Sequence, residues 1–282
     1  MKIAVYANCQ STAIGFMLGK LIPSAQWLRL RAVQDIKKSE YEPFMETISK
    51  ADIIIHQPIG DGFVVSSDKL RQELPHKQLV SFPSVYFAGL CPQLCGLRHY
   101  SQGAINGPLG AYHDARIIRS FLKGRSATHC ASDLESGDEA MLKCFAPMLD
   151  EAVSREHGLD VKCMDIVQEH YKEQNVMYTF NHPSNFLLWQ MAKRICAAIG
   201  HKTSVDNDAF PKPFLNDTVS CVPEYIADHH DLSWRQPSYC KAGEQLDMQA
   251  VIDEFYEIYS HHVDFETVCR RSSTRISLPI FS

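Results

Sequence analysis

The sequence lacks the motifs that mark three large groups of nucleotide-binding and hydrolytic enzymes. No G-x-G-x-x-G follows the first predicted strand, so a dinucleotide site of the Rossmann type is disfavoured. No G-x-x-x-x-G-K-[ST] is present, which removes a P-loop, and no G-x-S-x-G, which removes the usual nucleophile elbow of α/β-hydrolases. A different arrangement of residues has to carry the chemistry.

An excess of positive charge and a long hydrophobic run are also absent. With 28 basic against 33 acidic side chains, the net charge of -5 gives no electrostatic basis for general nucleic-acid binding. No stretch reaches the roughly 18 apolar residues of a membrane helix, and the first residues do not form a signal peptide. We therefore expect a cytoplasmic globular protein with no nucleic-acid partner and no membrane span.

The ten cysteines form neither a metal-ligand pattern nor a disulfide framework. The closest pair, Cys91 and Cys95, has the spacing C-x3-C and no second pair to match it, so no metal site is predicted. Scattered cysteines in a reducing compartment are usually small buried apolar groups. Any cysteine with a chemical role must therefore stand out by its position.

Strand and helix patterns alternate along the first 200 residues. Apolar runs rich in β-branched residues predict buried strands, with helical patterns between them. This alternation predicts an α/β fold with a doubly wound, mostly parallel sheet and additional helices. Residues 1–200 are predicted to form the catalytic core, and residues 201–282 an extension made of an irregular segment and a helix. The predicted strands cover residues 2–8, 27–33, 51–55, 78–82 and 176–180.

Residues 84–113 have no periodicity, and a loop of that length inside a compact domain is either functional or a segment whose elements are misassigned. The glycines of residues 107–113 either let a ligand approach the backbone closely or form a turn before the next helix. Four basic residues follow, which either bind phosphates or form the solvated face of that helix. They are Arg116, Arg119, Lys123 and Arg125.

Polar residues follow three of the predicted strands at the point where each strand ends. The segments are Asn8-Cys9-Gln10-Ser11, His56-Gln57-Pro58 and Asn181-His182-Pro183. In open parallel sheets, ligands bind beyond the carboxyl ends of the strands. We therefore predict a site at this edge of the sheet.

Cys9 is the candidate nucleophile because it stands where a strand turns into a helix. Unpaired N–H groups at a helix N-terminus favour a thiolate and can hold an oxyanion. His182 is the candidate general base, and His56 has the same logic with weaker support. The alternatives are a packing cysteine and a histidine that caps a strand end.

Four of these motifs together resemble the WcbI-type polysaccharide biosynthesis proteins. They are N-C-Q at 8–10, H-Q-P at 56–58, F-P-x-x-x-F-x-G at 82–89 and N-H-P-S-N at 181–185. The resemblance implies acetyltransferases of capsule biosynthesis that bind coenzyme A and use a variation of the SGNH-hydrolase fold, with a flavodoxin-like sheet. By position, Cys9 replaces the SGNH serine and His182 is the histidine. Thr179 stands where that pattern has an aspartate, so either a dyad suffices or another group orients the imidazole.

The resulting hypothesis is an acyltransferase that moves an acetyl group from acetyl-coenzyme A to a sugar hydroxyl. An SGNH-like esterase or thioesterase is the near alternative, and a non-catalytic glycan- or nucleotide-binding module the distant one. The backbone at Cys9 and Gln10, with the Gln57 amide, is expected to stabilise the oxyanion. The predicted catalytic group is Cys9, His182, Gln10, Gln57, His56 and Asn8, and the predicted coenzyme A contacts are Ser11, Tyr112, His113, Arg98 and Arg116.

Overall fold

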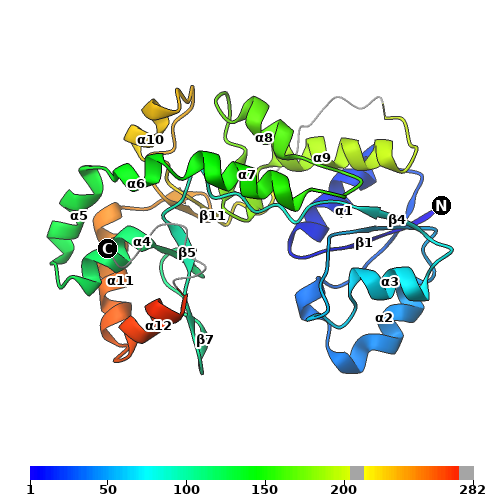
Figure 1. Ribbon diagram of the computed structural model, residues 1–282, viewed down its shortest axis with the longest axis horizontal. Coiled ribbons are helices and arrows are strands. Elements are labelled where there is room, and N and C mark those ends of the chain that lie inside the picture. The colour runs from blue at the N-terminus through cyan, green and yellow to red at the C-terminus, as the bar shows by residue number, and fades with distance from the viewer. Residues whose placement is uncertain (204–212, 273–282) are drawn as a thin grey trace. The chain divides into compact units, whose positions relative to one another are not determined.

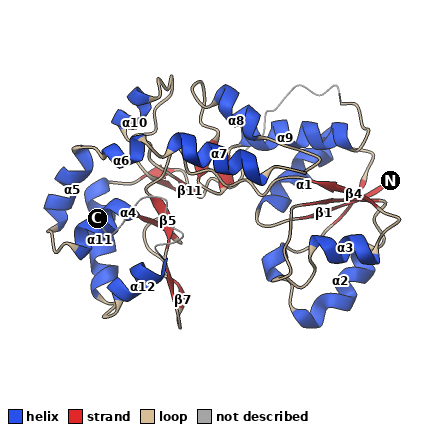
Figure 2. Cartoon of the chain, viewed as in Figure 1, coloured by secondary structure: helices blue, strands red, loops and turns tan. Residues whose placement is uncertain are grey.

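The structure, a computed structural model, describes residues 1–203 and 213–272 as two compact units interleaved along the chain. Both units contain helices and strands, which confirms the α/β class (Figures 1 and 2). These units do not coincide with the predicted division at residue 200. Unit 1 is residues 1–85, 152–169 and 183–215, and unit 2 is residues 86–151, 170–182 and 216–282.

A four-stranded parallel sheet forms the centre of unit 1, in the order β2-β1-β3-β4. Its strands are β1 (Lys2–Tyr6), β2 (Gln26–Leu28), β3 (Ile53–His56) and β4 (Gln78–Ser81). Helices α1 (Gln10–Leu21) and α9 (Asn185–Ala198) lie on one side of the sheet, and α2 (Tyr41–Ile48) and α3 (Ser67–Glu73) on the other (Figure 1).

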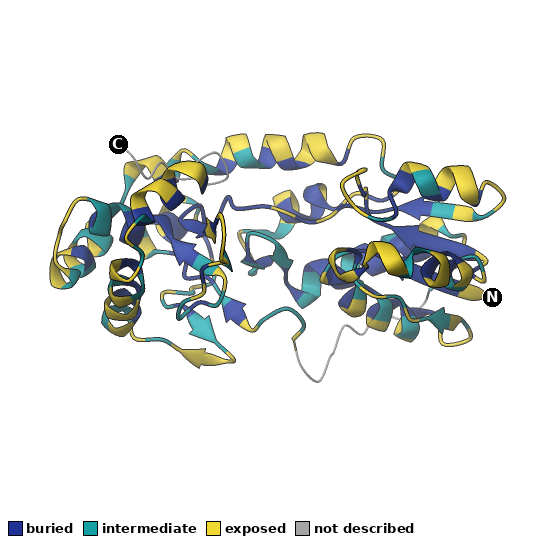
Figure 3. Ribbon diagram, turned by 90° about the horizontal axis from the view of Figure 1, so that it is seen from below, coloured by how far each residue is buried: buried dark blue, intermediate teal, exposed yellow. Residues whose placement is uncertain are grey.

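Side chains of the central strands alternate between the two faces of this sheet and are buried on both. Ala4 and Tyr6 pack in one hydrophobic cluster with Ile48 of α2 and Leu70 of α3. Their neighbours on β1 point to the opposite face, which α1 and α9 cover. Burial on both faces explains why β1 and β3 are nearly continuous apolar runs in the sequence (Figure 3).

The second strand is shorter than predicted. β2 ends at Leu28, and residues Val33–Asp35 form a 3-10 turn instead of the end of a strand. Val33 is buried, and its N–H donates to the carbonyl oxygen of Ala7 just beyond β1. The alternation of residues 27–33 therefore reflects a segment that closes the end of the sheet rather than one that extends it.

Unit 2 is built from helices and very short antiparallel strands. Three pairs of strands are present: β5 (Leu94–Gly96) with β8 (Tyr112–Asp114), β6 (Arg98–His99) with β7 (Gly103–Ala104), and β9 (Met177–Thr179) with β10 (His182–Pro183). A fourth group has three strands, β11 (Thr218–Val219), β12 (Cys240–Lys241) and β13 (Glu244–Gln245). The helices are α4 (Ala115–Leu122), α5 (Ala127–Glu135), α6 (Glu139–Leu142), α10 (Glu224–His229), α11 (Met248–Ser260) and α12 (Phe265–Ser272). Helices α7 (Phe145–Arg155) and α8 (Met164–His170) each contain residues of both units.

Two predictions about this part of the chain are wrong. Residues 84–113 are not one irregular loop, because β5 to β8 lie within or at the end of that stretch. The strand predicted at 176–180 exists as β9, but it pairs with β10 and does not join the parallel sheet. An apolar run of this length specifies a buried strand without specifying its partner. His182 therefore does not follow a strand of the sheet that delivers Cys9.

No helix within the described ranges of the chain has the length and apolar character needed to cross a membrane.

Candidate functional site

Polar residues at the ends of β1 and β3 form a connected hydrogen-bond network in unit 1. The backbone N–H of Asn8 donates to Oε1 of Gln57 at 2.9 Å, and Nε2 of Gln57 donates to Oε1 of Gln10 at 2.9 Å. Nδ2 of Asn8 donates to the hydroxyl oxygen of Ser84 at 2.9 Å. The predicted convergence of these two strand ends is thus present.

The side-chain amide of Gln57 is fully engaged within this network. Its Nε2 donates to Gln10 and, at 3.4 Å, to the carbonyl oxygen of Pro83, while its Oε1 accepts from Asn8. Gln10 and Gln57 are both buried. Both amide hydrogens of Gln57 are therefore used inside the protein, which suits a residue that positions the strand ends better than one that donates to an oxyanion.

Cys9 is the N-cap residue of α1, and its side chain is exposed. All ten cysteines lie in the described part of the chain; seven are buried, Cys144 and Cys240 are half-buried, and Cys9 alone is exposed. Asn8 Oδ1 lies 4.0 Å from the Cys9 sulfur and also accepts the N–H of Gln10 at 3.0 Å. Cys9 thus differs from the other cysteines in the way that its position in the sequence indicated.

The pKa of the Cys9 thiol does not move in the expected direction. Desolvation by the surrounding protein raises this pKa above its ordinary value, although the N–H groups of Cys9 and Gln10 act to lower it. The pull of the helix N-terminus is therefore real but smaller than the cost of desolvating the thiolate. A base is needed to remove the proton before this sulfur becomes a strong nucleophile.

His56 ends β3 in a buried position and is held by the backbone. Its Nδ1 lies 2.8 Å from the carbonyl oxygen of Gln57 and 3.3 Å from the hydroxyl of Ser67. Burial lowers the pKa of this imidazole, so the ring stays neutral near pH 7. These contacts describe a histidine that fastens the start of α3 to the end of β3.

His182 lies in unit 2 beside Tyr112, which the sequence predicts as a coenzyme A contact. The Tyr112 hydroxyl is 3.4 Å from Nδ1 and 3.3 Å from Nε2 of His182, and the two rings meet at 82°. The same hydroxyl donates to Oδ1 of Asn181 at 2.7 Å, and Thr179 donates to both groups. The position that carries an aspartate in the SGNH pattern is therefore connected to His182 through a tyrosine.

Of the other predicted coenzyme contacts, His113 is already engaged by contacts within unit 2. His113 is buried, with Nε2 on the carbonyl oxygen of Ile105 at 2.8 Å and Nδ1 on the hydroxyl of Tyr259 at 3.0 Å. Burial lowers its pKa to about 4. Arg98 is exposed on β6, and Ser11 is half-buried in the first turn of α1, in unit 1.

The glycine-bearing stretch before α4 approaches the protein itself rather than an open surface. Gly107 and Gly110 exchange two backbone hydrogen bonds of 2.8 Å, and Gly110 has a φ of +68°. A Cβ atom at Gly107 would lie 2.6 Å from the ring of Phe255 on α11. The space left by the missing side chain of Gly107 is filled by the ring of Phe255 and not by a ligand. This favours the interpretation of the stretch as a turn before the helix.

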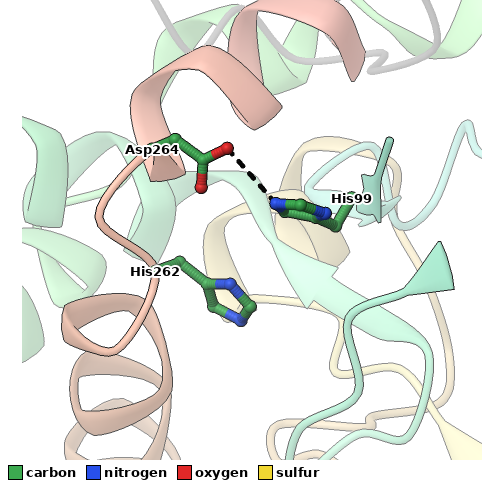
Figure 4. Close-up of side chains that lie close together, drawn as sticks. All are labelled: His99, His262 and Asp264. Atoms are coloured by element: carbon green, nitrogen blue, oxygen red, sulfur yellow. Dashed lines mark hydrogen bonds and ion pairs between the residues drawn. The ribbon is translucent and has the colours of Figure 1, made fainter. Parts of the chain in front are cut away.

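One group in unit 2 has the composition of a metal site, although none was predicted. The side-chain ligand atoms of His99, His262 and Asp264 lie within 4.8 Å of one another (Figure 4). However, Nδ1 of His99 accepts the N–H groups of Ser101 and Gln102, each at 3.2 Å. The ring proton therefore sits on Nε2, which donates to Asp264 at 3.2 Å, and no lone pair is left there for a metal. This arrangement is that of a hydrogen-bonded pair linking β6 to α12.

Two residues at these sites were missed as functional candidates. Ser84 was noted only within the F-P-x-x-x-F-x-G stretch, yet it bonds Asn8; a polar residue just after the end of β4 was the available signal. Tyr112 was identified, but as a ligand contact rather than as the neighbour of His182. No local pattern links residues 70 positions apart, so that role could not be found in the sequence.

Comparison with known proteins gives one family and one fold. Residues 2–204 match the family described as polysaccharide biosynthesis enzyme WcbI. No curated protein matches the chain. Among solved structures, the chain is similar to that of WcbI, described as a novel polysaccharide biosynthesis enzyme, with a TM-score of 0.75 and 20% identity over 96% of this chain and 98% of that chain. That structure is described as the native protein without the disulfide bond between coenzyme A and one of its cysteines. At this identity the similarity shows a shared fold.

Proposed function

Because the chain belongs to the family of the polysaccharide biosynthesis enzyme WcbI, we propose that it is an acyltransferase that moves an acetyl group from acetyl-coenzyme A to a sugar hydroxyl. The observation that carries this proposal is Cys9, the one exposed thiol among the ten cysteines, at the N-terminus of α1 and beside the amide of Asn8. The WcbI structure is described as lacking a disulfide bond between coenzyme A and one of its cysteines, and this mention of the coenzyme together with a cysteine supports proposing a coenzyme A site near Cys9.

In the proposed reaction, the Cys9 sulfur attacks the thioester carbonyl, a Cys9 acetyl-thioester forms, and coenzyme A leaves as its thiol. The N–H groups of Cys9 and Gln10 at the start of α1, which act to lower the pKa of Cys9, are the proposed donors to the developing oxyanion. The acceptor hydroxyl then attacks the acetyl group, and the Cys9 sulfur departs as the thiolate.

His182 is the proposed general base of the reaction. The raised pKa of Cys9 leaves little thiolate at neutral pH, so proton removal has to be part of the first step. Tyr112, held by Asn181 and Thr179, is the group that fixes the ring of His182 in unit 2. Gln57, Gln10 and Asn8 position the strand ends. His56 contacts the carbonyl oxygen of Gln57 and the hydroxyl of Ser67, and so fastens the end of β3 to α3.

Coenzyme A contacts are proposed for Ser11, in the first turn of α1 after Cys9, and for Arg98 and Arg116 through charge. His113 has no free ring nitrogen, so it suits a structural role behind Tyr112. The parallel order β2-β1-β3-β4 with helices on both faces supports an SGNH-like, flavodoxin-like core for unit 1.

The proposal is tested by intact-protein mass spectrometry after incubation with acetyl-coenzyme A and no acceptor. We expect the mass of one acetyl group on the wild-type protein and none on Cys9→Ala, while Cys144→Ala, a change at a half-buried cysteine, keeps the adduct. Slow decay of the adduct in water with release on adding a sugar acceptor supports the transferase. Rapid turnover without an acceptor would instead show a thioesterase. Absence of any adduct on the wild-type protein would remove the covalent mechanism.

A second probe separates coenzyme binding from acyl chemistry. Oxidised coenzyme A exchanges with a thiolate, giving a Cys9–coenzyme A disulfide and releasing one coenzyme A thiolate. Cys9 should acquire one coenzyme A in this way, and Cys9→Ala none. A protein that takes up the coenzyme but shows no acetyl adduct would keep the binding assignment and lose the transferase.

A further inference from the structure

Unit 2 contains a cavity of 290 Å³ lined by four basic side chains on and just after α4 and by residues of α5 and of the loop between α5 and α6. Figure 1 shows where these helices lie in unit 2. The sequence alone left these basic residues as either a phosphate site or the solvated face of a helix. The structure separates the two interpretations because it brings all four to one concave surface. They are Arg116, Arg119, Lys123 and Arg125.

Positive charge exceeds negative charge on the walls of this cavity. Two aspartates also line it: Asp138 is paired with Arg119, and Asp133 with Arg125. Lys123 has no ion-pair partner among the residues that the structure describes, and its side chain is exposed. Arg116 is paired with the buried Asp114, so three of the four cations are matched by carboxylates and the charge of Lys123 remains for an anion to neutralise.

Arg116 is the residue that a merely solvated helix face does not explain. It is only 5% exposed, and it is held by Asp114, which is fully buried. Nε donates to Asp114 Oδ1 at 3.1 Å and Nη2 to Oδ2 at 2.7 Å. The third nitrogen, Nη1, has no hydrogen-bond partner among the described residues, and the side chain lines both this cavity and a neighbouring one of 780 Å³.

Asp114 therefore holds the guanidinium of Arg116 in a fixed position. A guanidinium fixed through two of its nitrogens loses little side-chain entropy when the remaining nitrogen binds an oxyanion. Tyr239 donates to Asp114 Oδ2 at 2.7 Å, and the carboxylate also caps the N-terminus of α4 through the N–H of Arg116 at 2.8 Å. The donor is therefore rigid before any ligand arrives.

We propose that this cavity of unit 2 binds a phosphate monoester, with Arg116 as the fixed donor and Lys123 as the mobile one. A phosphate group matches the unpaired charge of Lys123 and the combination of a planar fork with an ammonium group. The ester is supplied by the 3′-phosphate of coenzyme A or by a phosphorylated sugar. The proposal does not depend on acyl transfer, because it concerns binding alone.

The experiment measures binding to the full chain by titration calorimetry at low ionic strength. Inorganic phosphate and glucose 1-phosphate report on the cavity, and 3′-dephospho-coenzyme A compared with coenzyme A separates the two sources. If coenzyme A is the source, loss of its 3′-phosphate should weaken binding about ten-fold. If a sugar phosphate is the source, both forms of the coenzyme bind equally and glucose 1-phosphate still binds.

Substitutions of residues that line the cavity test whether the phosphate binds there. Lys123→Glu, at an exposed side chain that no ion pair restrains, should weaken phosphate binding about ten-fold or more. Arg116→Lys should also weaken it, since the fork is lost while the charge remains. Lys143→Glu is the matched control: it lies on the same unit just after α6, outside the cavity lining, and should change affinity by less than two-fold, roughly the effect of a remote charge.

The proposal is overturned if wild-type protein binds neither phosphate nor glucose 1-phosphate and does not distinguish the two forms of coenzyme. It is equally overturned if Lys123→Glu and Arg116→Lys both bind phosphate as the wild type does. Because Lys123 is exposed, its variant folds even if Arg116→Lys does not, and the test remains decisive.

Discussion

The two units solve the problem of buried polar groups in different ways. In unit 1 the network at the ends of β1 and β3 is uncharged, made of the amides of Asn8, Gln10 and Gln57. In unit 2 the buried network is ionic, with Asp114 paired to Arg116 and accepting from Tyr239. A neutral network holds the backbone in place through hydrogen bonds between uncharged groups. An ionic network holds a charged side chain, here the guanidinium of Arg116, in a fixed position.

This difference fits what each region is proposed to do. Cys9 needs a rigid surrounding that leaves the thiol's protonation to a separate base, and uncharged amides supply it. An anion site needs a cation that is fixed in position, and the buried carboxylate of Asp114 fixes the guanidinium of Arg116. The predictions below test this contrast through stability.

The largest effect is expected for Asp114→Asn in unit 2. This change keeps the shape of the side chain but leaves the Arg116 charge buried without its partner, which costs about 3–5 kcal/mol of unfolding free energy. Denaturant unfolding measures it. The control is Asp133→Asn, at a pair that is about 40% exposed on both sides, where a loss below about 1 kcal/mol is expected. Equal losses in the two variants would remove the contrast between buried and exposed pairs.

A pH-dependent effect is expected at His113, also in unit 2. Its pKa is about 4 in the folded protein against an ordinary 6.5, so below pH 6.5 the unfolded chain binds a proton that the folded chain does not. Stability is therefore fully present above pH 6.5 and falls towards pH 4; between pH 7 and pH 5 this histidine contributes a loss of about 2 kcal/mol.

Unfolding curves at the two pH values check this effect. His113→Gln, although less stable at pH 7, should lose about 2 kcal/mol less than wild type between pH 7 and pH 5. His76→Gln, at an exposed site, should leave that difference unchanged. A wild-type difference that persists in His113→Gln would assign the pH dependence to another group.

A smaller loss is expected for Gln57→Leu in unit 1. The apolar side chain fills the same space but leaves the N–H of Asn8 and Oε1 of Gln10 without this partner. Because Asn8 is only half-buried, we expect about 1–2 kcal/mol, the lower part of the range for an unsatisfied buried group. Gln78→Leu, at an exposed position on β4, is the control. A loss as large as that of Asp114→Asn would show that the neutral network is no more tolerant than the ionic one.

The smallest effect is expected for Cys9→Ala. The exposed thiol packs against little, so the change in unfolding free energy should stay within about 0.5 kcal/mol, while the acetyl adduct is lost. Cys95→Ser, at a fully buried site, should cost about 1–3 kcal/mol and leave the adduct in place. A reversal of these two outcomes would mean that Cys9 is a packing residue after all.

The sequence was most informative where local signals decide the structure. Helix α3 lies between two of the predicted strands, where a helical segment is expected, and the hydroxyl of Ser66 caps it by accepting the N–H of Lys69. The strands β1, β3 and β4 were also found, since burial on both faces leaves a continuous apolar run. The exposed Cys9 at the start of α1 followed from the same strand-to-helix junction.

Sequence was least informative where the partner of a segment decides the outcome. Nothing in residues 176–180 distinguishes a strand of the parallel sheet from β9 in a separate pair. The pairing of Arg116 with Asp114 was not predicted, although both are near neighbours in the chain, because burial of a charge depends on residues as distant as Tyr239. The direction of the Cys9 pKa shift was missed for a related reason: the helix N-terminus is visible in the sequence, but the desolvation that outweighs it is not.

The interleaving of the two units has a consequence for how the protein is made and divided. Six segments alternate between the units, so the chain passes from one to the other five times. The sheet of unit 1 is finished by residue 81, but α9, which covers one face, follows only at residue 185. During synthesis, about 100 further residues have to be made before α9 can cover that face of the sheet. This order favours late, cooperative folding over folding one unit at a time. Neither unit can be obtained by cutting the chain at one place, and insertions are best tolerated at exposed turns rather than at the passages between units.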